Sequence, residues 1–184
     1  MDKGAQHYER FISGDKNAIG DIIKEYRAGL ELYIYSVVGD ISIAEEITQE
    51  TFVKLFTKRP RFRKSASFKT WLYTIGKNSA LNYIKKHSRN VSLDCEGGVC
   101  FHADVETLEE IYLADERKKA VHKALGKLKK EYREILWLTY FEGMSNKESA
   151  DVMNKKVHNI HTLLTRARQA LKKQLEEDGF DYEI

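Results

Sequence analysis

One stretch of the chain combines basic and aromatic residues in a pattern that suits nucleic acid. Between Thr51 and Leu93 there is no Asp or Glu, whereas an ordinary solvated surface mixes both signs of charge. The basic residues of this stretch are Lys54, Lys58, Arg59, Arg61, Arg63, Lys64, Lys69, Lys77, Lys85, Lys86 and Arg89. Its rings include Phe52, Phe56, Phe62, Phe68, Trp71, Tyr73 and Tyr83. Because Lys and Arg pair with phosphates and rings stack on bases, the pattern indicates single-stranded nucleic acid. The alternative is that many of these rings only fill a core.

A second group of polar residues, near the C-terminus, is typical of a helix that reads duplex DNA. Ser145 followed by Glu148 has the spacing of a capping box, so a short helix should begin there and end at Met153–Asn154. A longer helix from about Lys156 to Leu175 completes the layout of a helix-turn-helix. Its early, exposed side offers Lys155, Lys156, His158, Asn159, His161, Thr162, Thr165 and Arg166. Asn and Thr can bind base edges, and Lys and Arg can bind phosphates.

Two other interpretations of this C-terminal segment stay open. The helix pair could belong to an unrelated bundle with a solvated basic face. His158 and His161 could be metal ligands, although exposed positions on a DNA-reading helix suit them better.

The basic, aromatic stretch is expected to lie on helices. Apolar residues at three-four spacing predict a helix over Ile19–Val38 that ends at Gly39. Ser42 and Glu45 have capping-box spacing, which predicts the start of a second helix that ends before Pro60. A basic loop over 61–67 and a helix over Phe68–His87 follow. The sequence therefore predicts an all-α protein with little room for sheet.

An acidic segment separates this first half from the second. Residues 94–110 contain Asp94, Glu96, Asp104, Glu106, Glu109 and Glu110 and no Lys or Arg. No helical or strand period is visible from Ser88 to about Asp104, and Gly97 and Gly98 are adjacent. We therefore predict two small helical domains, 1–90 and 107–184, joined by a flexible acidic linker over 91–106. Helices are expected from near Thr107 towards Leu125 and over Lys130–Phe141.

Other kinds of function find little support in the sequence. Cys95 and Cys100 have only His102 and Glu96 nearby, so we expect an unbound, reduced pair, with a metal site or redox switch as the alternative. No local pattern indicates a catalytic grouping or a phosphate-binding loop, so we expect neither an enzyme nor a cofactor. No apolar run is long enough to span a bilayer, and the N-terminus lacks the layout of a secretory signal. These features predict a cytoplasmic protein.

Several motifs together resemble the extracytoplasmic-function (ECF) sigma factors of bacterial RNA polymerase. Ala44–Phe52 resembles the second-region motif of that family, and Phe68–Asn78 resembles the helix that helps to melt the minus-ten promoter element. Tyr132–Leu136 with Tyr140–Ser145 is similar to the fourth region, and Arg166–Arg168 matches its ending. Some positions depart from the family pattern, namely Lys129, Asn154, Ser149, Lys155 and Asn82. The departures in the recognition helix affect which promoter sequence the protein is expected to prefer, and not the expected fold.

The resemblance implies a role for each group of residues. Binding of the core polymerase would fall to Glu45, Glu46, Gln49, Glu50 and Phe52. The minus-ten element would be bound by Arg61, Arg63, Lys64, Ser65, Ser67, Lys69, Thr70, Trp71, Lys77, Asn78, Lys85 and Lys86. The minus-thirty-five element would be bound by the eight residues of the C-terminal helix named above. The resemblance also implies contacts with the largest and β subunits of the polymerase, an anti-sigma factor as inhibitor, and association with the nucleoid when active.

Two rival functions remain. A polymerase-independent helix-turn-helix regulator would share the C-terminal helices, but it does not explain the acid-free, aromatic stretch. An adaptor that binds RNA or single strands would explain that stretch, but it would show no promoter preference.

Overall fold

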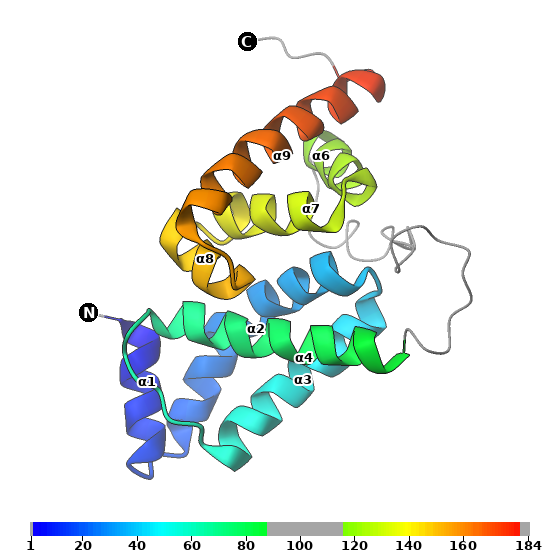
Figure 1. Cartoon of the computed structure of the whole chain (residues 1–184). Helices are drawn as coiled ribbons and strands as arrows, with labels where there is room; N and C mark the ends of the chain where they lie inside the picture. The colour runs from blue at the N-terminus through cyan, green and yellow to red at the C-terminus, as the bar shows by residue number, and fades with distance from the viewer. Residues whose placement is uncertain (1, 88–115, 181–184) are drawn as a thin grey trace.

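The computed structural model describes residues 2–87 and 116–180, and every regular element within these ranges is a helix. The helices form an N-terminal domain, residues 2–87, and a C-terminal domain, residues 116–180 (Figure 1). The predicted linker over 91–106, both cysteines and the start of the helix predicted from Thr107 lie outside the described residues. The prediction of an all-α protein with two domains is confirmed.

The N-terminal domain is built around one long helix. It contains α1 (Lys3–Ile12), α2 (Asn17–Val38), α3 (Ile41–Lys58) and α4 (Phe68–His87). The face of α2 that the apolar spacing predicts is half-buried at Ile19 and Ile23 and buried at Ile22, Tyr26, Leu30, Tyr33, Ile34 and Val37. Because α1, α3 and α4 all pack against α2, this helix forms the centre of the domain.

The ends of these helices follow local chemistry, with one correction. Gly39 ends α2 with a left-handed φ of 79°, as predicted. The N-cap of α3 is Asp40, whose side chain accepts a hydrogen bond from the Ile43 backbone N–H at 2.9 Å. The capping box predicted at Ser42 is therefore wrong, because a better cap directly follows the glycine. Helix α3 ends at Lys58, just before Pro60.

Helix α1 was not predicted, and it supports the start of α4. Asp2 accepts hydrogen bonds from the Ala5 N–H at 3.2 Å and from the Phe68 N–H at 2.5 Å, so one carboxylate caps α1 and satisfies the first turn of α4. Gly4 lies in the contact, where an added Cβ would come within 2.5 Å of both the Phe68 ring and the Tyr26 hydroxyl. Close packing of α1 therefore fixes the position where α4 begins.

The C-terminal domain carries the predicted helix-turn-helix. Its elements are α6 (Glu116–Lys127), α7 (Lys130–Leu136), the π-helix η1 (Trp137–Phe141), α8 (Asn146–Met153) and α9 (Val157–Glu177). The capping box of Ser145 and Glu148 is present at the start of α8, and Asn154 makes the turn with a left-handed φ of 52°. The buried side chains of Ala150 and Ile160 hold α8 against α9. The predicted motif is therefore confirmed.

The helix predicted over Lys130–Phe141 is continuous, but its last turn widens into η1. A π-turn adds a residue to the helical repeat and changes which side chains share a face. In η1 it stacks the rings of Trp137 and Phe141 at 4.4 Å between centroids.

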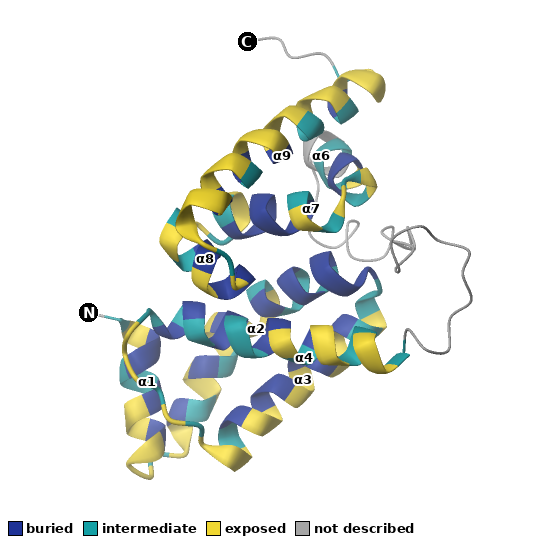
Figure 2. Cartoon of the chain, viewed as in Figure 1, coloured by how far each residue is buried: buried dark blue, intermediate teal, exposed yellow. Residues whose placement is uncertain are grey.

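The two domains pack against each other. Helix α8 lies on α4, while α7 and η1 contact α2 (Figure 1). Buried residues continue from the core of one domain towards the other across this contact (Figure 2). The interface therefore brings the C-terminal domain onto the helix that was predicted to bind the minus-ten element.

Candidate nucleic-acid interfaces

Helix α9 presents the predicted recognition residues to solvent. The exposed residues of this set are Lys156, His158, Asn159, His161, Thr162, Thr165 and Arg166, and Lys155 is half-buried. The opposite side of the helix is anchored by Ile160, Leu164 and Ala167. Lys155 makes an ion pair with Glu131 of α7 at 2.8 Å. The helix therefore offers amide, hydroxyl, imidazole and cationic groups on one exposed face, as binding in a major groove requires.

The loop over 61–67 is held by rings and by one backbone contact. The Tyr8 hydroxyl donates a hydrogen bond to the Pro60 carbonyl at 2.7 Å. Phe62 packs on Trp71, with 5.1 Å between ring centroids, and on Phe68 at 5.8 Å. Burial is the main cause that raises the pKa of Tyr8 to about 12, so its hydroxyl keeps its proton near neutral pH. The rings fix both ends of a loop whose Arg61, Arg63, Lys64 and Ser65 are exposed.

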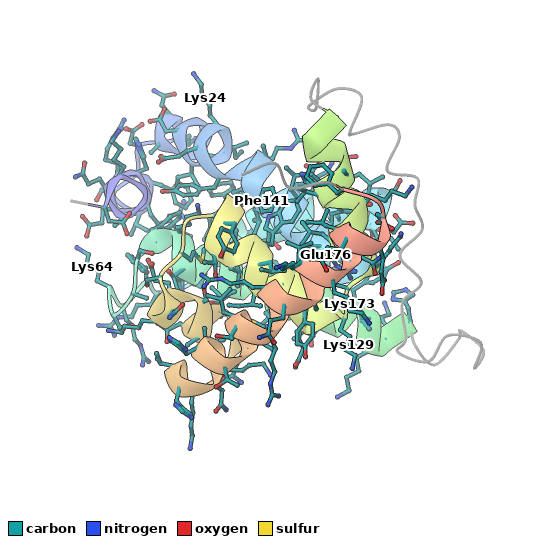
Figure 3. The ribbon with its side chains drawn as sticks, turned by 90° about the horizontal axis from the view of Figure 1, so that it is seen from above. Lys24, Lys64, Lys129, Phe141, Lys173 and Glu176 are labelled. Atoms are coloured by element: carbon teal, nitrogen blue, oxygen red, sulfur yellow. The ribbon has the colours of Figure 1, made fainter. Side chains whose placement is uncertain are left out.

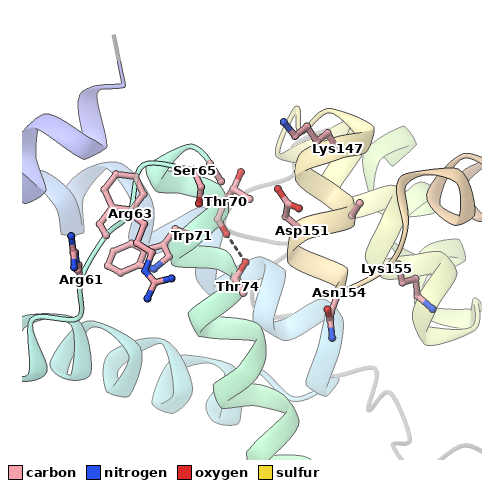
Figure 4. A pocket seen from close by; sticks show the side chains of 13 residues that line it. Arg61, Arg63, Ser65, Thr70, Trp71, Thr74, Lys147, Asp151, Asn154 and Lys155 are labelled. Carbon is pink, nitrogen blue, oxygen red and sulfur yellow. Dashed lines mark hydrogen bonds between the residues drawn. The ribbon is translucent and has the colours of Figure 1, made fainter.

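A cavity of about 600 Å³ opens between this loop and α8 (Figure 4). One wall carries Arg61, Arg63 and Trp71, and the other carries Lys147 and Lys155. The remaining lining residues are Phe62, Ser65, Ala66, Thr70, Thr74, Ala150, Asp151 and Asn154. The cavity combines an aromatic wall with cations from both domains, which are the groups that bind a base and its phosphates.

Three predicted minus-ten residues on α4 are bound by the C-terminal domain. The Lys77 Nζ lies 2.6 Å from a carboxylate oxygen of Glu134, and both side chains are less than a tenth exposed. The Lys69 Nζ lies 2.8 Å from the Glu142 carboxylate. Thr70 is buried, and its hydroxyl contacts Glu148 at 3.3 Å. These residues therefore face the other domain in this conformation.

The other predicted minus-ten residues are half-buried or exposed. Ser67 is half-buried and its hydroxyl donates to Glu148 at 3.0 Å. Trp71 is half-buried in the wall of the cavity. Asn78, Lys85 and Lys86 are exposed towards the end of α4. The structure brings the loop and the start of α4 to one place, while these last three residues lie farther along the helix.

Two tyrosines complete the contact between domains. The Tyr33 hydroxyl donates to Glu134 at 2.8 Å, and the Tyr73 hydroxyl donates to Glu142 at 2.6 Å. Burial, followed by the neighbouring carboxylate, raises the pKa of both phenols well above the ordinary value. Both phenols are therefore donors across the physiological range of pH.

Glu148 has a double role in the structure. Its carboxylate closes the capping box of α8 by accepting from the Ser145 N–H at 3.0 Å, and it also accepts from Ser67 and Thr70 of the other domain. Partial burial acts to raise its pKa, but the hydrogen bonds from Ser145, Ser67 and Thr70 together outweigh burial, so the pKa lies below its ordinary value.

The residues predicted to bind the core polymerase lie along α3. Glu45, Glu46, Gln49 and Glu50 are exposed. Phe52 is only 6% exposed and belongs to the core, so it supports the helix from within. Glu45 is 3.3 Å from Arg27, and Glu50 is 2.9 Å from Lys54. Helix α3 therefore offers an acidic face that also exposes Val53.

Sequence reasoning missed the residues that bind α4 from the other domain. Glu134 and Glu142 occur in motifs that the resemblance had placed in the fourth region, but nothing local indicates that they face α4. It also missed the ring cluster of His122, Trp137 and Phe141, where His122 lies 5.2 Å from Phe141 and Phe141 is 45% exposed. Trp137 is only 4% exposed, whereas Phe141 lies at the surface beside it.

Within residues 2–87 and 116–180, no cluster of three or more His, Cys, Asp or Glu side chains is arranged to hold a metal ion. Across the same ranges, no helix is both long and apolar enough to cross a bilayer.

Both halves of the chain match known protein families. Residues 22–90 match the family model for sigma-70 region 2, and residues 118–171 match that for sigma-70 region 4. The RNA polymerase sigma-H factor of Pseudomonas aeruginosa is 32% identical over 184 aligned residues, which cover 96% of this chain and 95% of that protein. The ECF sigma factor SigW of Bacillus subtilis is 29% identical, covering 89% of this chain and 92% of that one.

Solved structures agree with these matches. CnrH in complex with the cytosolic domain of CnrY is 26% identical, with a TM-score of 0.65 over 95% of this chain and 96% of that one. The sigma factor RpoE of Bartonella quintana, in complex with the anti-sigma factor NepR, has the same fold, with a TM-score of 0.65 at 21% identity over 85% of this chain and 96% of that one. The chain therefore belongs to the sigma-70 family as an ECF sigma factor, and it serves promoter-specific initiation by RNA polymerase.

Proposed function

We propose that the protein brings three surfaces to one initiation complex. The acidic face of α3 binds the core polymerase, the loop 61–67 with α4 binds and opens the minus-ten element, and α9 binds the minus-thirty-five element as duplex. The observation that carries this proposal is the order of the two matched regions, each of which displays the polar face that its role needs.

The core-binding surface comprises Glu46, Gln49 and Glu50 with Glu45 at its edge. Three- and four-residue spacing places these side chains on neighbouring positions of a helix. Phe52, buried beneath them, fixes the direction of α3 rather than contacting the partner itself. The charges of this face suit fast and specific association with a partner of opposite charge.

The minus-ten surface joins exposed cations to a cavity lined by rings. Arg61, Arg63 and Lys64 are placed to hold phosphates, while Phe62 and Trp71 line a cavity of about 600 Å³. A base leaves the duplex only at a cost of a few kcal/mol, so a pocket that binds the displaced base stabilises the open strand selectively. Ser65, Ser67 and Thr70 supply hydroxyl groups, and Asn78, Lys85 and Lys86 extend the polar surface along α4.

An inhibitory protein partner is part of the proposal. CnrH is similar to this chain and is bound by CnrY, and RpoE of Bartonella quintana, which shares the fold, is bound by NepR. We propose that an anti-sigma factor holds this protein until a signal releases it. The protein then works in the cytoplasm and on the nucleoid, without a catalytic reaction or cofactor of its own.

The first test is run-off transcription on a library of genomic fragments with bacterial core polymerase, with and without this protein. New, discrete start sites that share two upstream elements are expected. Glu46→Lys should abolish these starts, while Glu25→Lys, an exposed charge reversal on α2 of the same domain, should leave them unchanged. If the wild-type chain instead binds duplex as a dimer and creates no start site, the polymerase-independent regulator becomes the better account.

A further inference from the structure

The loop over 61–67 is held by a helix that neither the sequence nor the family match connects with promoter DNA. Helix α1 precedes residues 22–90, the range that matches sigma-70 region 2. We propose that α1 positions this loop, with Asp2 and Tyr8 as positioning residues that fix the pocket in which a minus-ten base is bound. This inference rests on the proposed function, because that function assigns the loop and its cavity to a displaced base.

The first contact fixes the end of the loop, where α4 begins. The two carboxylate oxygens of Asp2 have separate partners, since Oδ1 accepts from the Ala5 N–H at 3.2 Å and Oδ2 accepts from the Phe68 N–H at 2.5 Å. The first N–H groups of a helix have no partner within the helix, and a charged acceptor binds them more strongly than a neutral one. Asp2 therefore joins the first turn of α1 to the first turn of α4.

The second contact fixes the start of the loop and the aromatic wall of the cavity. Tyr8 is 3% exposed, and its hydroxyl donates to the Pro60 carbonyl at 2.7 Å. The centroid of its ring lies 5.2 Å from that of Trp71, on which Phe62 also packs. Trp71 and Phe62 both line the cavity. One side chain of α1 therefore contacts the backbone where the loop starts and the ring that forms the cavity wall.

The third contact reaches the middle of the loop. Lys64 has a left-handed φ of 55°, which residues other than glycine seldom adopt. Its Nζ makes an ion pair with Glu9, and its side chain lies beside α1 at the edge of the domain (Figure 3). Both side chains are exposed, and exposed ion pairs contribute little to stability. We therefore assign the main part of the positioning to Asp2 and Tyr8.

A loop of this kind needs support from its neighbours to form a base pocket. Residues 61–67 form no helix, and the chain passes from the end of α3 along α1 to the start of α4 (Figure 1). A segment that is ordered before it binds loses less conformational entropy on binding. The groups that contact a ligand also need neighbours that hold them in the productive geometry. The contacts from α1 meet the loop at its start, middle and end, so they supply this support.

A helix that only stabilises the domain would act differently from one that positions the pocket. Loss of general stability would weaken the binding of every strand by the same factor. Loss of pocket geometry would weaken only the part of binding that depends on the captured base. A cycle that removes the protein group and the base, separately and together, distinguishes the two effects.

The test measures binding of a single strand to the complex of the full chain with core polymerase. The strand carries the minus-ten element mapped by run-off transcription, and fluorescence anisotropy compares it with strands that have one abasic site, at each position in turn. The captured base is the one whose removal weakens wild-type binding most, by about fivefold or more, because its stacking on a ring is lost.

Two variants each remove one hydrogen bond between α1 and the loop. Asp2→Asn keeps one acceptor oxygen, so it can accept from Ala5 or from Phe68 but not from both. Tyr8→Phe keeps the ring against Trp71 and loses the hydroxyl that binds Pro60. Each variant should weaken binding of the intact strand about three- to tenfold. Binding of the strand that lacks the captured base should change by less than about twofold.

The matched control is Asp40→Asn in the same domain. Asp40 caps α3 through one oxygen, which accepts from the Ile43 N–H. Asn caps helices about as well as Asp, so this variant should bind the intact strand as wild type does. All three variants should bind the minus-thirty-five duplex equally, and circular dichroism shows whether each one folds. Each of the two test variants answers the question by itself, so the test does not depend on both of them folding.

The outcomes separate the two proposals. Losses confined to the strand that keeps the captured base would support the role of α1. Equal losses for intact and abasic strands, or no loss at all, would overturn that role, while run-off transcription would still support the sigma function. If no abasic site weakens wild-type binding, the base pocket of the proposed function fails, and the inference about α1 fails with it.

Discussion

The two surfaces assigned to promoter DNA differ in what covers them. On α9, Asn159, Thr162 and Arg166 are exposed, with an apolar anchor on the opposite side of the helix. On α4, Lys77 and Thr70 are buried against the C-terminal domain, and Lys69 pairs with Glu142. The first surface can meet duplex DNA as it stands, whereas the second must first lose intramolecular partners. Binding of promoter DNA to α4 therefore costs the free energy of breaking these contacts, whereas binding to α9 does not.

The largest expected effect contrasts one cation from each surface. Lys77→Ala leaves Glu134 without its cation in a buried contact, and we expect the free energy of unfolding to fall by about 3 kcal/mol. Arg166→Ala removes an exposed cation and should change the free energy of unfolding by less than about 0.5 kcal/mol. Urea unfolding followed by circular dichroism compares the two. Equal, small losses would mean that Lys77 is not buried in solution.

The next prediction concerns the exposed surface. Asn159→Ala should weaken binding to a cognate duplex by about 1–3 kcal/mol, because a side chain that reads a base edge is lost. Lys156→Ala should weaken binding to all sequences and lower the slope of log affinity against log salt by about 1. Lys172→Ala, an exposed lysine farther along α9, is the control. If Asn159→Ala weakens binding to cognate and random duplexes equally, Asn159 does not bind a base edge.

A smaller effect is expected at the cap of α8, which positions the exposed surface. Ser145→Ala removes the acceptor of the Glu148 N–H and should cost about 1 kcal/mol of stability. Ser42→Ala is the matched control, because Asp40 caps α3 and the Ser42 side chain is not its cap. Thermal unfolding of both variants measures the difference. A loss at Ser42 as large as that at Ser145 would contradict the assignment of the caps.

The smallest expected effect is a pH dependence of stability that arises from Glu148. This residue caps α8 and also contacts the start of α4. Its pKa in the folded protein lies below the ordinary value of 4.5, so the unfolded chain binds more protons between the two values. Stability from this group is therefore complete above the ordinary pKa and is lost as pH falls through the lowered one. Glu148→Gln should make the unfolding free energy fall less steeply below about pH 4.5 than in wild type. If Glu148→Gln leaves this pH dependence of the unfolding free energy unchanged, Glu148 does not contribute to it.

Much of the fold could be predicted from local signals. Gly39, Pro60, Asn154 and the Ser145–Glu148 capping box act within a few residues of themselves, and the structure has helix ends at each of them. Ser42 misled the prediction because Asp40 offered a carboxylate at a better position. The short helix α1 and the wide turn of η1 were missed because their signals depend on packing partners far along the chain.

The exposed site was easier to predict than the covered one for the same reason. The polar face of α9 is a property of one helix, so its periodicity predicts exposure. The burial of Lys77 depends on Glu134, which lies 57 residues later by number and in another domain. No spacing within α4 indicates that its acid-free surface meets carboxylates supplied from elsewhere.

The most direct test compares both DNA surfaces in one titration series, using promoter elements mapped by run-off transcription. Fluorescence anisotropy would measure binding of the minus-thirty-five duplex and of the minus-ten single strand, first to the free protein and then to its complex with core polymerase. We predict that the free protein binds the duplex, but that it binds the single strand at least about tenfold more weakly than the complex does. Binding of the single strand by the free protein as tightly as by the complex would contradict the account.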